Sequence, residues 1–443
     1  MNAPVESGES SLQRFNYFGL FFGRSNCPGV TPRMSHHPPI FHIQENGFGA
    51  LNGRESLYMD SFLATTYHLL PFLPASTFRD LLGSFSRIHC ITKCLVLAAL
   101  ALGATVTKNT EHAEGLCEEA RQALSRFEDM VNLRAIQIDV LISYYLVTTG
   151  RPNASYLVIG RAMRRAFAGG FGKEGVGVNH LNEERLRERR LTWASAVMVD
   201  RIFSYAFGRP SAFTGSSSTP APFVSKFPGF VPLPPGYPIL DTISRLSPIM
   251  SRAISEIYCS RKKSLLKSYK SAMEIQKEIE GLKATMDPSL RISVDTPIAE
   301  DSDGVKQILA YNIIQHAYML TFRPFLLFRA MLNPTSPIST QKLQKLNQAC
   351  RICVDTAREF VTILDNACKS NPLVRVSPPS SQFHAYTYLP RRSDSTAFIS
   401  KQPPSSSRTR PLSTNPRSRP RTRSLLPSKP PLNASRSSKS GFH

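Results

Sequence analysis

The amino-acid sequence predicts an all-α fold, an irregular multi-helix bundle or solenoid followed by a disordered basic tail rich in Ser, Pro and Arg. Hydrophobic residues make up 41% of the 443 residues, which allows a substantial core and excludes a wholly disordered chain. From Tyr58 to Asn371 apolar residues recur with the 3.6-residue period of helices, and no run alternates as a half-buried strand does. No period of about 34 or 40 residues stands out, so a regular array of helical repeats is not expected.

Five helices are expected in the first half of this region. Two short helices flank the proline-bounded loop LPFLPAS, and a long apolar stripe from Ile88 to Leu102 predicts the third. The stripe that reaches Tyr145 is followed by Gly150-Arg151-Pro152, and glycine and proline terminate helices. The expected ranges are 60–69, 76–85, 87–106, 116–127 and 133–149.

Capping residues mark the next two helices. Asn153 is expected to cap a helix that continues through residue 168 and ends at two glycines. Asn182 is expected to cap a long helix over 183–207, and Glu184 in its first turn suits the positive end of the helix dipole. The turn Gly208-Arg209-Pro210 then stops this helix.

The second half of the region begins with a proline-rich loop over 210–238. A long helix is expected over 240–284, and a polar break separates it from a helix over 305–331. A final helix is expected over 340–368. Together these elements define one helical domain over 56–370.

Composition also indicates what precedes this domain and in which environment the protein folds. The segment 1–55 is expected to be disordered or loosely ordered, and it lacks the apolar stretch of a secretory signal. The longest apolar run, Cys94 to Val106, is shorter than the roughly 20 residues that a membrane-spanning helix needs. Eight cysteines in a chain of this length are too few for a disulfide scaffold, so an intracellular protein without membrane contact is expected.

The tail over 371–443 carries much of the positive charge. The net charge is +22 with a pI of about 9.9, and the tail contains 13 basic residues against one acid, Asp394. Its many prolines break helices, and few large apolar groups offset the entropy of ordering. Three interpretations stand: a disordered arm along phosphate backbones, a nuclear-import signal, or translation of an unspliced intron or a shifted reading frame after Cys368.

Two short motifs match patterns for cofactor or metal binding, but the sequence around each of them does not support that function. Gly170 to Gly175 matches GxGxxG, but a helix rather than a strand precedes it, so a helix end with a loop is favoured. Cys350 and Cys353 form a CxxC pair on an expected helix with no second pair nearby in sequence, which favours buried thiols over zinc. No paired carboxylates or nucleophile constellation is evident, so no enzyme activity, cofactor or metal is expected. A positive chain favours anionic partners, and nucleic acid is one such class.

One basic patch lies on an expected helix. It consists of Arg261, Lys262, Lys263, Lys267 and Lys270. Two interpretations stand for this patch: a stripe that contacts phosphates, or a solvated helix face with no partner.

A specific pattern, here called the signature residues, spans the middle of the chain. In order it contains Gly160, Arg161, Ala162, Arg165, Ala166, Glu184, Arg189, Arg190, Trp193, Asp200, Arg201, Gly208, Arg209 and Pro210. This order resembles the fungal-specific transcription factor domain, the middle homology region of fungal zinc-cluster transcription factors. The flanks 60–82 and 316–329 resemble the opening and a later helix of that domain. Gly172 stands where the family often has His, and Thr192 and Ala194 flank Trp193 where a second aromatic is common.

The resemblance implies a fungal transcription factor in the nucleus. Such a protein regulates RNA polymerase II gene expression through its helical domain, here for genes of a metabolic or secondary-metabolite pathway. Its expected partners are DNA, contacted weakly or through another protein, a second copy or a zinc-cluster factor as dimer partner, and a small-molecule effector. The alternative is an effector-sensing or inhibitory partner of a zinc-cluster factor that does not bind DNA.

The resemblance also implies a zinc cluster, whose six cysteines usually open full-length members. Only Cys27 precedes residue 90, so the cysteines of that cluster are absent and no zinc is expected in this chain. The signature residues are expected to act structurally. Ala162 and Ala166 form a small-residue stripe, and Trp193 packs in the core. Arg189 or Arg190 pairs with an acid on a facing helix, and the adjacent Asp200 and Arg201 point to different partners.

Overall fold

The computed structural model describes residues 53–172, 181–212, 233–258, 264–293, 298–332 and 338–376. All of them belong to the first of two compact units, Met1–Leu389, and the second unit, Pro390–His443, lies outside the described residues. Nearly all of the segment 1–55, most of the proline-rich loop and the tail beyond residue 376 also lie outside them. The expectations of disorder for these segments therefore stay predictions.

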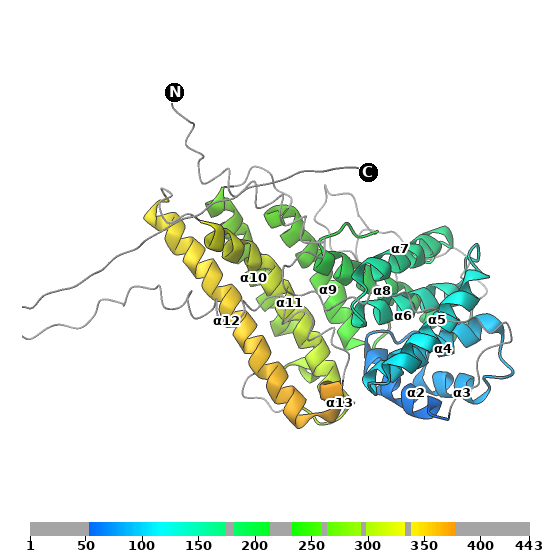
Figure 1. Ribbon diagram of the computed structural model, residues 1–443. Coiled ribbons are helices and arrows are strands. Elements are labelled where there is room, and N and C mark those ends of the chain that lie inside the picture. Colours follow the sequence, from blue (N-terminus) through cyan, green and yellow to red (C-terminus); the bar gives the residue numbers. More distant parts are fainter. Residues whose placement is uncertain are drawn as a thin grey trace, which may run out of the picture. The chain divides into compact units, whose positions relative to one another are not determined.

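The described residues form helices and contain no strand, which confirms the all-α prediction. Three short helical turns, Thr66–His68, Ile254–Tyr258 and Pro288–Leu290, accompany the α-helices. The α-helices drawn in Figure 1 are α2 (Glu55–Ala64), α3 (Ala75–Gly83), α4 (Cys90–Val106), α5 (Thr110–Ser125), α6 (Leu133–Thr148), α7 (Pro152–Ala168), α8 (Glu183–Phe207), α9 (Pro238–Ala253), α10 (Leu265–Thr285), α11 (Ser302–Met331), α12 (Thr340–Ser370) and α13 (Pro372–Val376).

Helices that follow one another in the chain pack against one another. α4 contacts α2, α5 and α6, and α7 lies against both α6 and α8. α8 contacts α9, which in turn packs on α10 and α11, and α11 lies along α12 (Figure 1). α4 is apolar on all sides, and nearly every residue from Cys94 to Val106 is buried. The result is an irregular bundle.

The predicted cap of α8 is confirmed. The Asn182 side chain accepts a hydrogen bond from the Arg185 backbone N–H at 2.9 Å. At the other end Gly208 adopts φ 64°, a left-handed conformation that glycine takes without a steric penalty.

The predicted cap of α7 is wrong. The cap lies two residues earlier, at Arg151, and the helix begins at Pro152; proline suits this first position because its missing N–H has no helical acceptor. The Asn153 side chain instead accepts a hydrogen bond from Arg209, at the far end of α8. A tertiary contact therefore uses the amide that the sequence offered as a local cap.

The prediction of one helix over 240–284 is also wrong. α9 ends at Ala253 and passes into a π-helical turn, Ile254–Tyr258, and α10 begins anew at Leu265. The Ser264 hydroxyl caps α10 by accepting from the Lys267 N–H at 3.4 Å. The apolar period continues across the break, because α9 and α10 pack against each other and both bury their apolar faces.

Ordered packing continues beyond residue 370, where the tail was expected to begin. Asn371 is fully buried, and its side-chain amide donates to the carbonyl oxygens of Ala299 and Asp301 at 2.8 Å each. Val374 on α13 is 3% exposed and packs with α11 and α12 in a second hydrophobic cluster. The change in composition after Cys368 therefore does not coincide with the end of the core.

His68 gives the fold a pH dependence. It lies in the turn after α2, where burial and the charge of Lys306 on α11 lower its pKa to about 4. An unfolded histidine titrates near 6.5, so the unfolded state gains a proton on acidification before the folded state does. Stability from neutral His68 is present above pH 6.5 and is lost as the pH falls toward 4. We expect the free energy of unfolding to drop by about 1–2 kcal/mol between pH 7 and pH 5.

Urea unfolding at several pH values checks this expectation. The variant His68→Gln removes the titrating ring, so its free energy of unfolding should fall less steeply over the same pH range. An identical pH slope in the two proteins would show that other groups cause the dependence.

Candidate functional site

The signature residues gather where α6, α7 and α8 pack together. Ala162 and Ala166 are fully buried on α7. α6 and α7 approach so closely that Ser143 and Ser155 bond across the contact: the Ser155 hydroxyl donates to the Ser143 carbonyl oxygen at 2.8 Å, and the Ser143 hydroxyl donates to the Ser155 carbonyl oxygen at 3.1 Å. Small residues on facing helices permit this approach.

Two signature arginines hold a buried carboxylate. Asp139 on α6 is fully buried, with Arg161 Nη2 2.5 Å from its Oδ1 and Arg165 Nη1 2.5 Å from its Oδ2. Arg165 also donates to the carbonyl oxygens of Phe127 and Glu128, at 3.1 and 3.0 Å, in the segment between α5 and α6. Burial raises the pKa of the Asp139 carboxyl, and the two guanidinium groups oppose that rise. Asp139 therefore ties α6 to α7, and Arg165 ties both to the segment that follows α5.

A second set of polar contacts joins α6 to α8. The Gln137 side-chain amide donates to Glu188 Oε1 and to Thr192 Oγ1, at 2.9 Å in both cases. Glu188 also accepts from Arg134 at 3.0 Å. Gln137 was not predicted as a site residue, and its contact with Glu188 was not foreseen, because nothing in the local sequence indicates which polar groups face each other across helices.

The start of α8 carries the signature residues Glu184, Arg189 and Arg190. Glu184 is exposed in the first turn, and Arg190 is partly buried. Arg189 donates to the Gly170 carbonyl oxygen at 2.7 Å and lies over the ring of Phe171, 4.7 Å from its centroid. These contacts hold the end of α7 against α8.

Trp193 forms a wall beside this contact. It is 7% exposed, and its ring meets Phe167 of α7 edge-on with a centroid distance of 5.9 Å. A Cβ on Gly172 would lie 2.6 Å from the Trp193 ring, closer than side chains approach. A histidine at this position would require Trp193 to move.

Adjacent residues near the end of α8 reach in different directions. Asp200 accepts a hydrogen bond from the Ser211 hydroxyl at 2.5 Å and from the Ala212 N–H at 3.3 Å. Arg201 donates to the Ser247 hydroxyl of α9 at 2.5 Å. Asp200 thus holds the chain after α8, and Arg201 joins α8 to α9.

Residues of α7 contact the turn at the end of α8. Arg209 lies over the ring of Tyr156, 4.9 Å from its centroid, and the Tyr156 hydroxyl donates to the Pro210 carbonyl oxygen at 2.8 Å. Arg209 also donates to Asn153. These contacts fix where the chain leaves α8.

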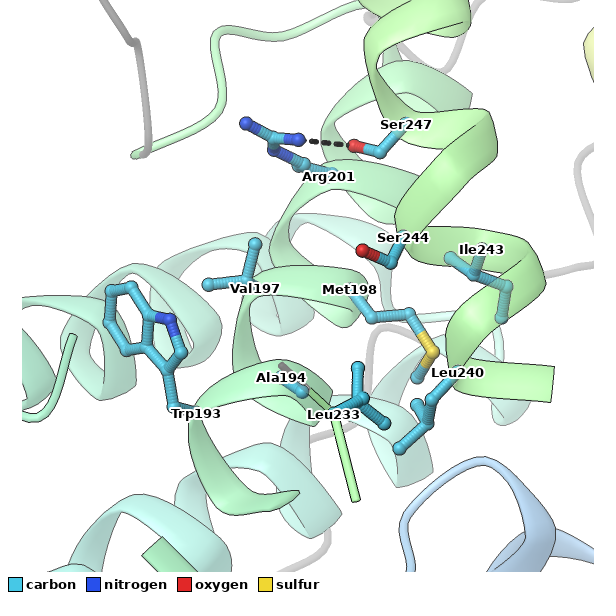
Figure 2. A pocket seen from close by; sticks show the side chains of 10 residues that line it. All are labelled: Trp193, Ala194, Val197, Met198, Arg201, Leu233, Leu240, Ile243, Ser244 and Ser247. Carbon is cyan, nitrogen blue, oxygen red and sulfur yellow. Dashed lines mark hydrogen bonds between the residues drawn. The ribbon is translucent and has the colours of Figure 1, made fainter. Parts of the chain in front are cut away.

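A pocket opens between α8 and α9 (Figure 2). Its cavity volume is about 30 Å³, room for about one or two water molecules. Its lining residues are Trp193, Ala194, Val197, Met198 and Arg201 from α8, Leu233, and Leu240, Ile243, Ser244 and Ser247 from α9. Each helix contributes one stripe of residues at helical spacing, and two signature residues, Trp193 and Arg201, lie in the wall.

Comparison with known protein families shows which family the chain belongs to. The family described as "Fungal specific transcription factor domain" matches residues 59–283, about half of the chain and every signature residue. The chain belongs to this family. The resemblance seen in the sequence is thereby confirmed.

Two curated relatives of this fungal transcription factor family member are uncharacterized transcriptional regulatory proteins of Schizosaccharomyces pombe. One is 25% identical over 198 residues, which cover 43% of this chain and 25% of the relative. The other is 22% identical over 266 residues, which cover 56% of this chain and 31% of the relative. The chain thus matches only about a quarter to a third of their length. No solved structure matches the chain.

The basic patch of this fungal transcription factor domain is only partly described. Lys267 and Lys270 are exposed on α10, and Arg261, Lys262 and Lys263 lie outside the described residues. Lys345 of α12 lies over the Tyr269 ring, 5.0 Å from its centroid, which adds a third cation beside the two exposed lysines.

Metal-binding groups are not assembled in the described part of the domain. No group of three or more His, Cys, Asp or Glu side chains there is placed to hold an ion. Burial raises the pKa of the Cys350 and Cys353 thiols to about 12, which disfavours the thiolate form that zinc binds. Cys350 and Cys353 therefore do not fit a zinc site. Among the same residues no helix is long and apolar enough to span a membrane.

Proposed function

We propose that this protein regulates transcription by RNA polymerase II in the nucleus, through its helical domain. The observation that carries the proposal is the family match over residues 59–283, which contains all signature residues. The pathway class that we propose for its target genes is metabolic or secondary-metabolite biosynthesis. Two relatives with matching segments bear the name of transcriptional regulatory proteins, which supports the same assignment.

We propose a scaffold role, without catalysis, for the signature residues. The Asp139 carboxylate accepts hydrogen bonds from two arginines. Asp200 accepts a hydrogen bond from Ser211, and Arg201 donates one to Ser247. Groups held in this way transmit the position of one helix to the next. The helical domain would therefore present a surface to another protein rather than turn over a substrate.

A reporter assay tests the main proposal. The full chain, fused to an unrelated DNA-binding domain and tethered at a promoter, should raise or lower reporter output several-fold. A destabilised variant such as Asp139→Asn, fused in the same way, serves as the control that depends on the folded domain. A tethered chain that leaves output unchanged, and that binds no zinc-cluster protein, would contradict the proposal.

Direct DNA contact by this chain is proposed to be weak and independent of sequence. Exposed lysines on α10, Lys267 and Lys270, supply part of it. Each phosphate contact contributes about one unit to the slope of log binding constant against log salt. We expect the double variant Lys267→Gln and Lys270→Gln to lower that slope by about two for duplex DNA.

The matched control removes two lysines that pair with acids elsewhere. Lys306 lies 2.6 Å from Asp303, and Lys369 lies 2.6 Å from Asp365. The variant Lys306→Gln with Lys369→Gln has the same net charge as the test variant and should keep the slope of the natural chain. Equal slopes for both double variants would assign the α10 lysines to a solvated face.

The pocket between α8 and α9 favours a second candidate function. In this alternative the protein is an effector-sensing or inhibitory partner of a zinc-cluster factor, as a homo- or heterodimer partner without DNA contact of its own. A chain that binds such a factor but shows no salt-dependent DNA binding would favour this alternative over direct contact.

A further inference from the structure

Lysines gather where the first two turns of α10 lie beside the first two turns of α12. Lys267 and Lys270 occupy these turns of α10 and are exposed. Lys342 and Lys345 occupy the same turns of α12 and are partly exposed. The two helices are in contact (Figure 1), and Lys345 Nζ lies 5.0 Å from the centroid of the Tyr269 ring of α10. The four lysines, here called the lysine surface, therefore join two helices that are distant in the sequence.

The lysine surface has no acid beside it in the sequence. Neither Asp nor Glu occurs in 257–273 or in 304–354. Within the part of the chain that the structure describes, none of the four lysines forms an ion pair. The next acid along α10 is Glu274, which already pairs with Arg252 at 2.8 Å. The positive charge of the surface is therefore available to attract an anion.

The position of these lysines is unfavourable for the isolated fold. The first turn of a helix carries partial positive charge, so acids stabilise it and lysines do not. The helices α5, α8 and α11 follow this rule with Glu111, Glu183 and Asp303. By contrast, α10 and α12 have no acid in their first turns and carry a lysine there. An anion bound beside both helix starts would relieve this repulsion.

The neighbouring side chains indicate which anion fits. The exposed residues of α12 around Lys342 and Lys345 are amides, Gln341, Gln344 and Gln348. Lysine and glutamine side chains supply phosphate contacts in protein–DNA complexes. Protein partners are instead held by aromatic and apolar anchors, and no large hydrophobic side chain of α10 or α12 is exposed among the described residues. The surface therefore fits a phosphate backbone better than an acidic protein segment.

We propose that the lysine surface follows the phosphate backbone of duplex DNA, with Lys342 and Lys345 of α12 as the second half of a footprint that α10 begins. This inference rests on the proposed direct contact with DNA, and it adds the α12 residues and the joint action of two helices. Because these lysines contact phosphates and not base edges, the surface strengthens binding to every sequence alike.

A salt titration of the full chain tests the α12 half of the footprint. Fluorescence anisotropy of labelled duplex DNA is measured between about 50 and 200 mM salt. The variant Lys342→Gln with Lys345→Gln should lower the slope of log binding constant against log salt by about two, and substitution of all four lysines should lower it by about four. Two duplexes of unrelated sequence should show the same loss. An unchanged slope in an α12 variant that circular dichroism shows to be folded overturns the proposal.

Two controls separate charge at this surface from charge elsewhere. Lys369 lies on the same helix but pairs with Asp365 at 2.6 Å. The single variant Lys345→Gln should lower the slope by about one, whereas Lys369→Gln should leave it unchanged. The variant Lys342→Arg with Lys345→Arg keeps both charges and should keep the slope of the natural chain. A slope that falls equally in the arginine variant and in the glutamine variant overturns the proposal, because charge would not be the cause.

The remaining outcomes distinguish this inference from the proposed function. If substitution of the four lysines weakens binding of polyglutamate but leaves the DNA slope unchanged, the surface serves an acidic protein and the proposal is wrong. If the α12 variant keeps the natural slope while Lys267→Gln with Lys270→Gln lowers it, direct DNA contact stands and the two-helix footprint is lost. If neither variant lowers the slope, both are lost, and the tethered reporter assay still decides the transcriptional function.

Discussion

The variant Asp139→Asn should lose about 3–5 kcal/mol of unfolding free energy, the loss typical of a buried ion pair that is left with one partner. The substitution keeps the shape of the side chain and removes only its charge. Arg165, whose side chain is 6% exposed, would then keep a buried positive charge beside a neutral amide. Arg161 is 40% exposed and can turn toward water, so the penalty comes mainly from Arg165.

Urea unfolding followed by circular dichroism measures this loss. Asp365→Asn is the matched control, because Asp365 pairs with Lys369 while their side chains are 58% and 72% exposed. An exposed pair contributes about 0–1 kcal/mol, so the control should unfold almost as the natural chain does. Similar losses in the two variants would contradict a special role for the buried carboxylate.

The double variant Asp139→Asn with Arg165→Met separates the charge effect from the other bonds of Arg165. Arg165→Met alone should also be costly, because the carbonyl oxygens of Phe127 and Glu128 lose their donor. The double variant should lose less than the sum of the two single losses, because the unpaired charge is no longer present. Additive losses would show that the two residues do not act as a pair.

The helices could be predicted from the sequence because their apolar residues recur with the 3.6-residue period of a helix. The same period concealed the break before α10. Residues on both sides of the break bury apolar side chains, and the signal of a new start was a single serine, Ser264. The predicted cap at Asn153 was wrong for a different reason. Its amide oxygen accepts a hydrogen bond from Arg209, which is distant in sequence, and does not cap the nearest helix.

The charged groups of the site could be predicted only in part. Arg161 and Arg165 were found because they belong to the family pattern, whereas their partner Asp139 lies in a separate apolar helix. Local sequence does not indicate which acid a buried arginine meets, because that pairing depends on how α6 and α7 cross. The pocket was missed for the same reason. Its two walls come from α8 and α9, which the proline-rich loop separates in the chain.

Helices α2 and α4 cross closely at Gly103, and Gly103→Ala should destabilise the domain by about 3 kcal/mol. A Cβ at this position on α4 would lie 1.8 Å from the Tyr58 carbonyl oxygen of α2. Tyr58 cannot easily move away, because it is 1% exposed, its hydroxyl accepts a hydrogen bond from Asn109 Nδ2 at 2.9 Å, and it lies 3.1 Å from His112 Nδ1. The methyl group must therefore push two backbones apart, and both helices lose their packing.

A second glycine in a neighbouring helix provides a matched control for this prediction. Gly115 lies within α5, and a Cβ there meets no atom within 4 Å. Gly115→Ala should stabilise the domain by about 0.5–1 kcal/mol, because alanine loses less conformational entropy than glycine in a helix. The same substitution is thus expected to have opposite signs on two adjacent helices, as measured by urea unfolding. A stabilising Gly103→Ala would mean that α2 does not cross α4 at this point.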